Sequence, residues 1–164
     1  KTRVNVSKHS TLRLGLNIRV KNKNYDDGQV YLTEMKEKFT EFGIHPGYEY
    51  HLKGTERLSP YWGIELNFVD RNCEREYSGA TTGVLIGSNG TDRAFSSFGM
   101  NFLAGADYYL YKHIYIGVEL GYGFENKTNK EVKLNDATRP LYTEEKEFNA
   151  GVNFNSAIRL GVCF

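Results

Sequence analysis

The chain has 164 residues, a length typical of one domain, and a formal net charge of +1 at pH 7. Its basic residues are interleaved with acidic ones and form no basic stripe, which argues against nucleic acid as a partner. Two cysteines are too few for a disulfide scaffold, and the sequence has no run of about 18 apolar residues that would form a transmembrane helix. No charged and then apolar leader opens the sequence, so we expect any secretory signal to have been removed or never included.

The chain begins with a strand-like stub over residues 3–6. Six longer segments follow, in which apolar residues alternate with polar ones, and they cover residues 12–20, 42–52, 62–68, 98–110, 116–124 and 150–164. A period of two residues is typical of β-strands with one apolar face, and an aromatic content of 14% also favours strands. Pro46 lies inside the second segment, and because proline lacks the N–H of the strand ladder, we expect a bulge there.

The connections between the predicted strands alternate between short and long. Short turns are expected over residues 7–11, 53–59 and 111–113, and connections of about twenty residues or more over 21–38, 70–97 and 126–146. This alternation is typical of an up-and-down barrel in an outer membrane, with short periplasmic turns and long extracellular loops. The sequence therefore predicts an all-β fold: one antiparallel, up-and-down transmembrane β-barrel domain over residues 1–164.

The polar face of the predicted strands is rich in glycine. It includes Gly15, Gly43, Gly47, Gly63, Gly99, Gly105, Gly117, Gly121, Gly123, Gly151 and Gly161. A water-soluble barrel of the lipocalin kind would show the same alternation with its apolar face turned inward. Glycine weakens strands and has no steric advantage on a solvent-exposed surface, whereas the interior of a narrow barrel needs very small side chains. We therefore predict that the polar face lines a lumen and that the apolar face contacts lipid.

Charged residues on the same polar face predict a luminal charge network. Its predicted members are Arg13, Arg19, Glu49, Glu65, Asp107, Glu119 and Arg159. Near the short turns the four carboxylates face only Arg13 and Arg159, and an unpaired buried charge costs several kcal/mol. We therefore expect Arg3, His51 or a cation on a further strand to face these carboxylates.

Aromatic residues gather toward the ends of the predicted strands. Tyr48, Tyr50, Trp62, Tyr108 and Tyr111 lie near the short turns, and Phe42, Phe68, Phe98, Phe124 and Phe148 lie near the long loops. Two such rows are typical of the girdles that transmembrane barrels place at the two membrane interfaces.

The C-terminal strand carries a resemblance to known proteins. Its residues Ile158, Leu160, Gly161, Val162 and Phe164 resemble the C-terminal assembly signal that the barrel assembly machinery recognises. The segments TLRLGLNI, IHPGYEYHLKGTERLSPYWGIEL, LAGADYYLYKHIYIGVELGYGF and NSAIRLGVCF are similar to small outer-membrane β-barrels of the OmpA/OmpX type. The resemblance implies eight strands, whereas the sequence shows six and a stub, so we expect a preceding strand upstream of Lys1.

Residues with catalytic or ligand-binding chemistry are few, and we predict no catalytic, cofactor or metal site. His45 and His51 share a face, but six residues of strand separate them by about 20 Å, too far to bind one metal. Ser59 with His51 and Glu49 is the nearest approach to an acyl-hydrolase set, but these side chains project toward the lumen, where no lipid ester is expected. The glycosylation-like triplet 89–91 is interpreted as a turn.

The sequence also contains two cysteines and one apolar triplet in a polar loop. Cys73 and Cys163 are expected near opposite membrane surfaces and therefore not bonded to each other. Val84, Leu85 and Ile86 form an apolar triplet between two glycines in a polar loop. We weigh two interpretations of the triplet, which are a surface that docks a partner protein and a hairpin extension that packs on neighbouring loops.

The predicted function is that of a non-enzymatic integral protein of the cell outer membrane. It would serve as a structural or accessory subunit of a larger assembly for secretion, insertion or uptake. Its expected partners are the lipid bilayer, the barrel assembly machinery and other outer-membrane proteins. The alternatives are a small channel, a lipid-modifying barrel enzyme and, less favoured, a soluble lipocalin-like carrier.

Overall fold

The computed structural model describes residues 1–25, 34–78, 82–111, 113–135, 139–153 and 158–162. Its elements are β1 (Thr2–Asn5), β2 (Ser10–Tyr25), β3 (Glu34–His51), β4 (Leu58–Ser78), β5 (Gly83–Ile86), β6 (Phe95–Tyr111), β7 (Ile114–Asn129), β8 (Lys133–Leu134), β9 (Glu145–Asn153) and β10 (Arg159–Val162). The described part of the chain contains no helix long and apolar enough to cross a membrane.

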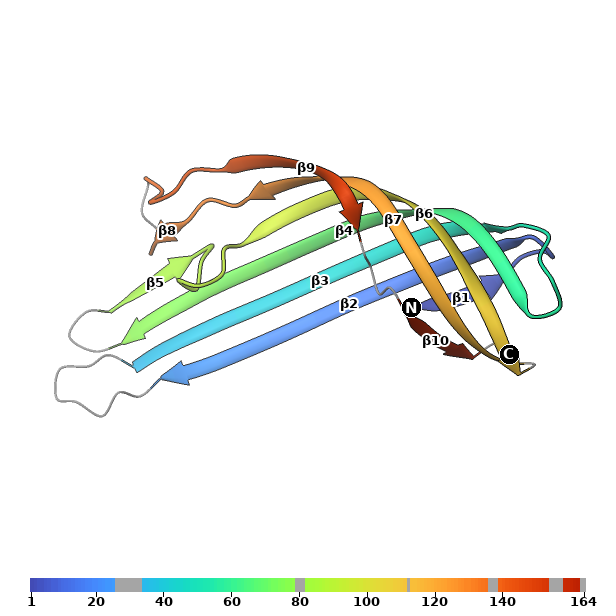
Figure 1. Cartoon of the computed structure of the whole chain (residues 1–164). Helices are drawn as coiled ribbons and strands as arrows, with labels where there is room; N and C mark the ends of the chain where they lie inside the picture. Colours follow the sequence, from blue (N-terminus) through green and yellow to red (C-terminus); the bar gives the residue numbers. More distant parts are fainter. Residues whose placement is uncertain (26–33, 79–81, 112, 136–138, 154–157, 163–164) are drawn as a thin grey trace.

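The strands form one antiparallel sheet in the order β1-β2-β3-β4-β6-β7-β10, with β9 also paired to β7. The sheet curves into a trough (Figure 1), so that it has a concave and a convex face. The tight turns 6–9 and 52–57 lie at one end, which we call the short-turn end, and the opposite end is the long-loop end. The predicted all-β, up-and-down antiparallel arrangement is therefore confirmed.

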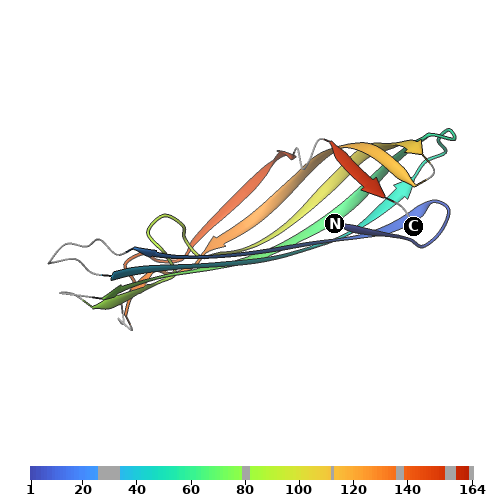
Figure 2. The ribbon, with the colours of Figure 1, turned by 90° about the horizontal axis from the view of Figure 1, so that it is seen from below.

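The predicted closure into a barrel is not found in the described residues. β1 forms one edge of the sheet, and β9 and β10 form the other (Figure 2). β1 is antiparallel to β2 and β10 is antiparallel to β7, and the alternation along the sheet makes β1 and β10 run in the same direction. An up-and-down barrel therefore needs a further antiparallel strand between these edges, and the sheet stays open without it.

The strands are longer than the apolar alternation predicted. β2, β3, β4, β6 and β7 have 16, 18, 21, 17 and 16 residues. Parts of the predicted loops 21–38, 70–97 and 126–146 are thus strand, because polar residues continue the ladder beyond the apolar run. Lys38, for example, lies opposite Glu74 in the β3–β4 register and its ammonium group contacts the carboxylate of Glu76. The predicted final strand is two elements, β9 and β10, both beside β7.

The bulge predicted at Pro46 is wrong. Pro46 pairs with Leu14 of β2 in an unshifted register. On the other side of β3 the pairing with β4 skips His45 and Pro46 and resumes in the same register at Gly47. The missing N–H therefore interrupts one ladder without inserting a residue. The register shift that the structure does show lies in the β6–β7 pair, between Tyr109 and Tyr111.

Candidate functional site

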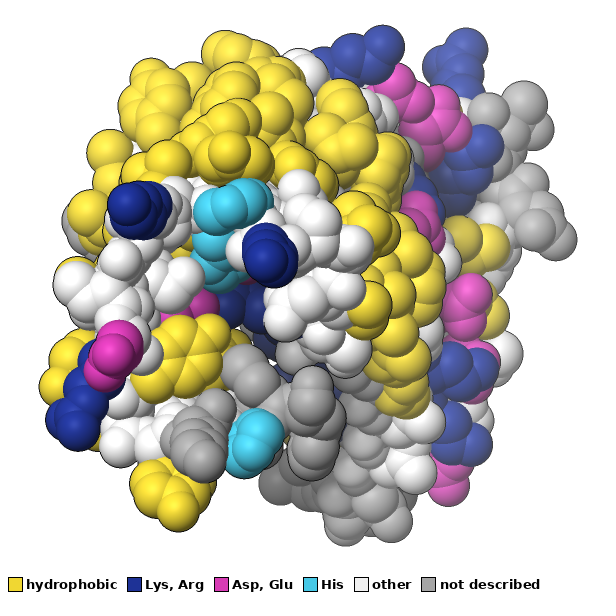
Figure 3. All heavy atoms as spheres, turned by 90° about the vertical axis from the view of Figure 1, so that its right-hand side faces the viewer, with side chains coloured by type: hydrophobic (Ala, Val, Ile, Leu, Met, Phe, Trp, Pro, Cys, Tyr) yellow, Lys and Arg dark blue, Asp and Glu magenta, His cyan; other side chains and the backbone are white. Residues whose placement is uncertain are grey.

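The two faces of the sheet have opposite chemistry, and the polarity is inverted relative to a water-soluble protein. The convex face exposes large apolar side chains, among them Leu16 at 59%, Val118 at 53% and Leu120 at 55%. The concave face buries charge: Glu49 is 0% exposed and Glu65 is 1% exposed. Figure 3 shows this from the short-turn end, with apolar side chains over much of the outer surface and charged atoms in the central hollow. Strand alternation alone produces this separation, because neighbouring strands pair in registers that keep odd-numbered residues on the concave face.

Eight charged side chains meet on the concave face at the short-turn end, and we call them the ionic cluster. Its members are Lys1, Arg3, Arg13, Arg159, Glu49, Glu65, Asp107 and Glu119. Arg13 lies at its centre: Nη1 is 2.9 Å from Glu49 and 2.7 Å from Glu119, and Nη2 is 3.0 Å from Glu65. Four cations thus face four carboxylates, as the charge balance of a buried cluster requires.

Side chains from both edges of the sheet reach the same carboxylate. Arg3 of β1 lies 2.6 Å from Asp107, and Arg159 of β10 lies 3.2 Å from it. Arg3 also contacts Glu49 at 2.8 Å, and Lys1 contacts Glu65 at 3.0 Å. Arg3 therefore supplies the additional cation that the sequence predicted. The sheet is curved strongly enough at this end to bring its two edges within reach of one residue.

Glycines make room for the large members of this face. A Cβ at Gly47 would overlap the side chain of Arg13, and one at Gly105 would overlap the ring of Tyr61. The Tyr61 hydroxyl donates to Glu119 at 2.8 Å and accepts from Arg159. Small and large residues alternate across the concave face because a strongly curved sheet has little room inside it.

Arg19 does not join the network, contrary to the prediction. It is exposed, and among the described residues it forms no ion pair with the four cluster carboxylates. Its register partner Glu41 is bound instead by Arg71 at 2.5 Å and by Asn17 at 2.9 Å. The physical reason is the distance along the strand, because Arg19 lies six residues, or about 20 Å, from Arg13 on β2.

The grouping of Ser59, His51 and Glu49 does come together. His51 Nδ1 lies 2.8 Å from Ser59 Oγ, and His51 Nε2 lies 3.4 Å from Glu49 Oε2. Glu49 is however bound by Arg3 and Arg13, which already balance its charge. His45 lies elsewhere and contacts Asn67 at 2.8 Å. No group of three or more potential metal ligands lies together in the described part of the chain.

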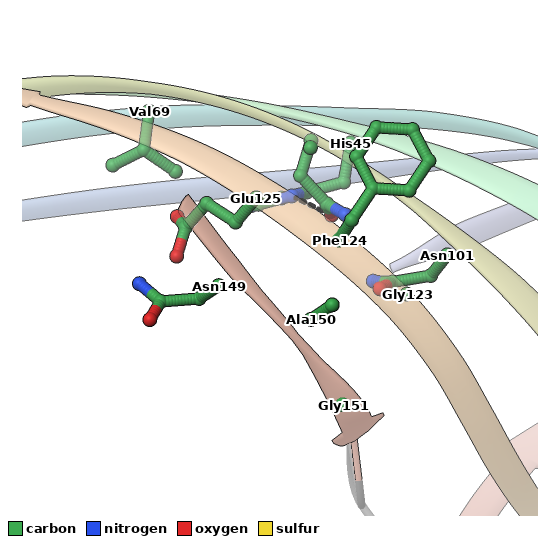
Figure 4. Close-up of a pocket in the computed structure, with 11 residues that line it drawn as sticks. His45, Val69, Asn101, Gly123, Phe124, Glu125, Asn149, Ala150 and Gly151 are labelled. Atoms are coloured by element: carbon green, nitrogen blue, oxygen red, sulfur yellow. Dashed lines mark hydrogen bonds between the residues drawn. The ribbon is translucent and has the colours of Figure 1, made fainter. Parts of the chain in front are cut away.

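A pocket of about 390 Å³ lies on the concave face next to the ionic cluster. It is lined by residues of β3, β4, β6, β7 and β9, including His45, Asn67, Asn101, Glu125 and Asn149 (Figure 4). Gly99, Gly123 and Gly151 also line it, so backbone forms part of the lining. Sequence reasoning missed this pocket, although the glycines of this face were the signal for it.

Segment 87–94 folds inward over the concave face at the long-loop end. Ala94 is buried with Phe39 and Cys73 in a small apolar core, and Asn89 is buried beside it. Arg71 lies between the rings of Phe39 and Phe95, with its guanidinium carbon 4.9 and 4.6 Å from their centroids. Asn89 Oδ1 accepts the N–H groups of residues 91 and 92, so the triplet 89–91 forms a turn, as predicted.

The triplet Val84–Ile86 lies in β5, which pairs with β4 and, through Leu85 and Leu134, with β8. Val84 and Leu85 are half-buried and Ile86 is exposed. The hairpin extension therefore describes its structure. Docking of a partner there stays a prediction, for which Leu85→Asp is the test: it should leave the sheet assembled and remove a co-purifying protein.

The predicted assembly-signal residues lie at the end of the sheet. Ile158 and Leu160 are 76% and 75% exposed, and Gly161 and Val162 pair with Tyr115 and Ile114 of β7. Phe164 and Cys163 lie outside the described residues, and Cys73 is a buried free cysteine.

Comparison with known proteins identifies no relative: no family model, no curated protein and no solved structure matches the chain.

Proposed function

We propose that the protein is an integral, non-enzymatic protein of the cell outer membrane and a structural or accessory subunit of a larger assembly there. The observation that carries the proposal is the inverted polarity of the sheet. Exposed leucine, isoleucine, valine and aromatic side chains cover the convex face, while the carboxylates of the ionic cluster are buried on the concave face. Hydrocarbon contact requires this arrangement and water disfavours it.

The soluble lipocalin-like carrier is the alternative that this polarity disfavours most. A carrier of apolar ligands needs an apolar interior, and here the interior positions hold Arg13, Glu49, Glu65 and Glu119. Such a carrier would also leave Leu16, Val118 and Leu120 in contact with water at more than half of their surface.

The aromatic rows support a membrane of ordinary thickness. Phe98 and Tyr108 lie at opposite ends of the apolar run of β6, and both are exposed on the convex face. Ten residues span about 33 Å along a strand, or about 25 Å across the membrane at a tilt of about 40°. The rings of Phe68 and Phe98 lie on neighbouring strands with centroids 5.1 Å apart, and those of Tyr50 and Trp62 lie on neighbouring strands with centroids 5.9 Å apart. The rows therefore match two interfacial girdles.

The proposal orients the long-loop end outward and the short-turn end with the C-terminus toward the periplasm. It also requires the terminal strand to engage the barrel assembly machinery. Replacing the terminal aromatic, Phe164→Asp, should leave export intact and sharply reduce the heat-modifiable form in the outer membrane. Normal insertion of this variant would contradict the assembly-signal part of the proposal.

The channel and enzyme alternatives are less favoured. The ionic cluster fills the concave face at the short-turn end, and segment 87–94 covers the concave face at the long-loop end. Because both ends are filled, we expect no large conductance in planar bilayers. For hydrolysis, Glu49 would have to support His51, yet its charge is already balanced by two arginines.

A charge placed on the convex face tests the membrane proposal directly. Leu120 lies in the middle of the apolar run of β7, and Leu110 lies at the short-turn end of β6; both are exposed. In a membrane Leu120→Lys should cost about 2–4 kcal/mol and abolish the heat-modifiable form, whereas Leu110→Lys near the interface should cost about 0–1 kcal/mol. The proposal would be refuted if the protein were soluble without detergent and if neither lysine substitution affected it.

A further inference from the structure

The long-loop half of the sheet has two open edges. β1 covers β2 only as far as Leu14, so the outer edge of β2 from Leu16 to Tyr25 has no strand partner in the described residues. The outer edge of β9 is likewise unpaired there, since β9 bonds only to β7. Unpaired backbone is costly in a membrane and invites further pairing.

The β2 edge is basic on its concave side and apolar on its convex side. Arg19, Lys21 and Lys23 follow one another along the concave side, and all three are exposed. Lys23 Nζ contacts the hydroxyl of Tyr25 at 3.2 Å, but among the described residues none of the three forms an ion pair with a carboxylate. On the convex side Leu16, Ile18 and Val20 are 59–69% exposed.

The β9 edge has the complementary chemistry. Glu145 and Glu147 lie on its concave side. Among the described residues Glu145 pairs with Arg93 at 3.3 Å, and Glu147 pairs with Lys127 at 3.8 Å and accepts a hydrogen bond from Asn129 at 2.5 Å. A carboxylate offers about four acceptor positions, which is more than these partners occupy. The convex side exposes Phe148 at 66% and Val152 at 59%.

We propose that the β2 edge of one copy of this chain pairs antiparallel with the β9 edge of a second copy. The inference rests on the proposed membrane location, which gives both copies the same orientation. In the register that places Lys23 opposite Glu145, Lys21 lies opposite Glu147. On the convex face the same register matches Val20 with Phe148, Ile18 with Ala150 and Leu16 with Val152. One register thus places Lys21 and Lys23 opposite Glu147 and Glu145, sets Arg19 opposite Asn149, and continues the apolar face.

A second copy fits these edges better than closure within one chain. Pairing β2 with β9 of the same copy would close a ring of six strands, and even eight strands leave an interior that side chains just fill. The concave side of one copy already holds segment 87–94 and a pocket of about 390 Å³. Each copy offers one edge of each kind, so a twofold dimer makes two such contacts and leaves neither edge open. At the short-turn end each copy keeps its own contacts of Arg3 and Arg159 with Asp107.

Cysteine cross-linking between differently tagged copies tests the pairing. In the stated register Asn22 lies directly opposite Lys146, and both are exposed on the convex face above the apolar run. One copy carries Asn22→Cys and the other carries Lys146→Cys, both in a Cys163→Ser background in which the buried Cys73 is retained. The copies are co-expressed, the outer-membrane fraction is isolated, and oxidant or a short thiol cross-linker is added. Directly opposite Cβ atoms are about 5 Å apart, so a covalent dimer carrying both tags should form.

Matched controls test the register and show whether the partner strand comes from a second copy or from the same chain. Neither copy, with its one introduced cysteine beside the buried Cys73, should cross-link when it is expressed alone. Asn22→Cys with Ala150→Cys should cross-link far less, because that pair lies four residues out of register. In a single chain, Asn22→Cys with Lys146→Cys should still yield a covalent dimer. A cross-linked monomer would instead show closure within one chain, and no cross-link in membrane-inserted protein would show that something else covers the edge; either result overturns the proposal. Absence of the protein from the membrane fraction would count against the membrane location itself.

Charge reversal supplies an independent readout. Lys21→Glu with Lys23→Glu in one copy should reduce the cross-linked dimer roughly tenfold, since like charges then lie directly opposite each other. Glu145→Lys with Glu147→Lys in the other copy should restore it. Failure of the second pair of substitutions to rescue the first would overturn the proposed register.

Discussion

The two ends of the sheet use the same strands in different ways. At the short-turn end the concave face holds a buried ionic cluster and the convex face is apolar. At the long-loop end the strands continue with polar residues on both faces, and the only apolar core among the described residues, Phe39 with Cys73 and Ala94, lies on the concave face. The first end therefore has buried charge and exposed apolar side chains, whereas the second has a small buried apolar core. The difference shows that strand alternation sets which side chains share a face, while the composition of that face differs between the two ends.

The largest effect is expected at the centre of the ionic cluster. Arg13→Met removes the cation that contacts Glu49, Glu65 and Glu119, so that three cations remain for four buried carboxylates. Breaking a buried ion pair costs about 3–5 kcal/mol. Urea unfolding in detergent, followed by the fluorescence of the single tryptophan and by gel mobility, should show a lower midpoint. Lys38→Met, at the exposed pair with Glu76, is the matched control. If both substitutions lowered the unfolding midpoint equally, the two ends would not differ in the way described.

A smaller and local effect is expected in the core of the long-loop end. Phe39→Ala removes a ring that is 4% exposed and that stacks on Arg71. Truncating a buried phenylalanine costs about 3 kcal/mol at the low end of the usual range. Segment 87–94 should become sensitive to protease while the heat-modifiable form persists. If the heat-modifiable form were lost together with the order of this segment, the two ends would form a single cooperative unit.

The reactivity of Cys73 sharpens the same comparison. Burial raises the pKa of this thiol to about 11, with a further contribution from the nearby carboxylate of Asp92. The thiolate is the reactive form, so at pH 8 the folded protein should resist iodoacetamide in a Cys163→Ser background. Labelling should rise between pH 9, where a free thiol ionises, and pH 11. Phe39→Ala should make Cys73 reactive at pH 8, and rapid labelling of the unaltered core at that pH would be inconsistent with its burial.

The smallest effect is expected from the exposed pair of Lys38 and Glu76. Their hydrogen bond lowers the pKa of Glu76 and raises the pKa of Lys38. The contribution of Glu76 is therefore present above its ordinary pKa of 4.5 and lost as the pH falls through the lowered value. The contribution of Lys38 is present below 10.5 and lost as the pH rises further. Because both groups are in water, Glu76→Gln should leave the unfolding midpoint at pH 7 unchanged within error, and a clear shift would show that this end is less hydrated than its exposure indicates.

Much of the ionic cluster could be predicted from the sequence, because its members lie at odd positions of strands with clear alternation. Arg13, Glu49, Glu65, Asp107, Glu119 and Arg159 meet as the shared face required, and Arg3 was one of the three alternatives expected from the charge balance. Arg19 was placed wrongly because alternation gives the face of a residue but not its neighbours across a curved sheet. The inward fold of segment 87–94 had no periodic signal at all, since it depends on contacts with Phe39, Arg71 and Cys73 on other strands.

The sequence by itself determined the strand type, the two faces and the alternation of short and long connections, because a period of two residues and the positions of glycine are local properties. Only the tertiary structure decided where each strand ends, how Pro46 is accommodated, which cations reach which carboxylates and that the described sheet is open between β1 and β10. These features depend on registers and curvature summed over many strands. A small change in register or in curvature gives a side chain different neighbours on the concave face, and no single segment of sequence contains that information.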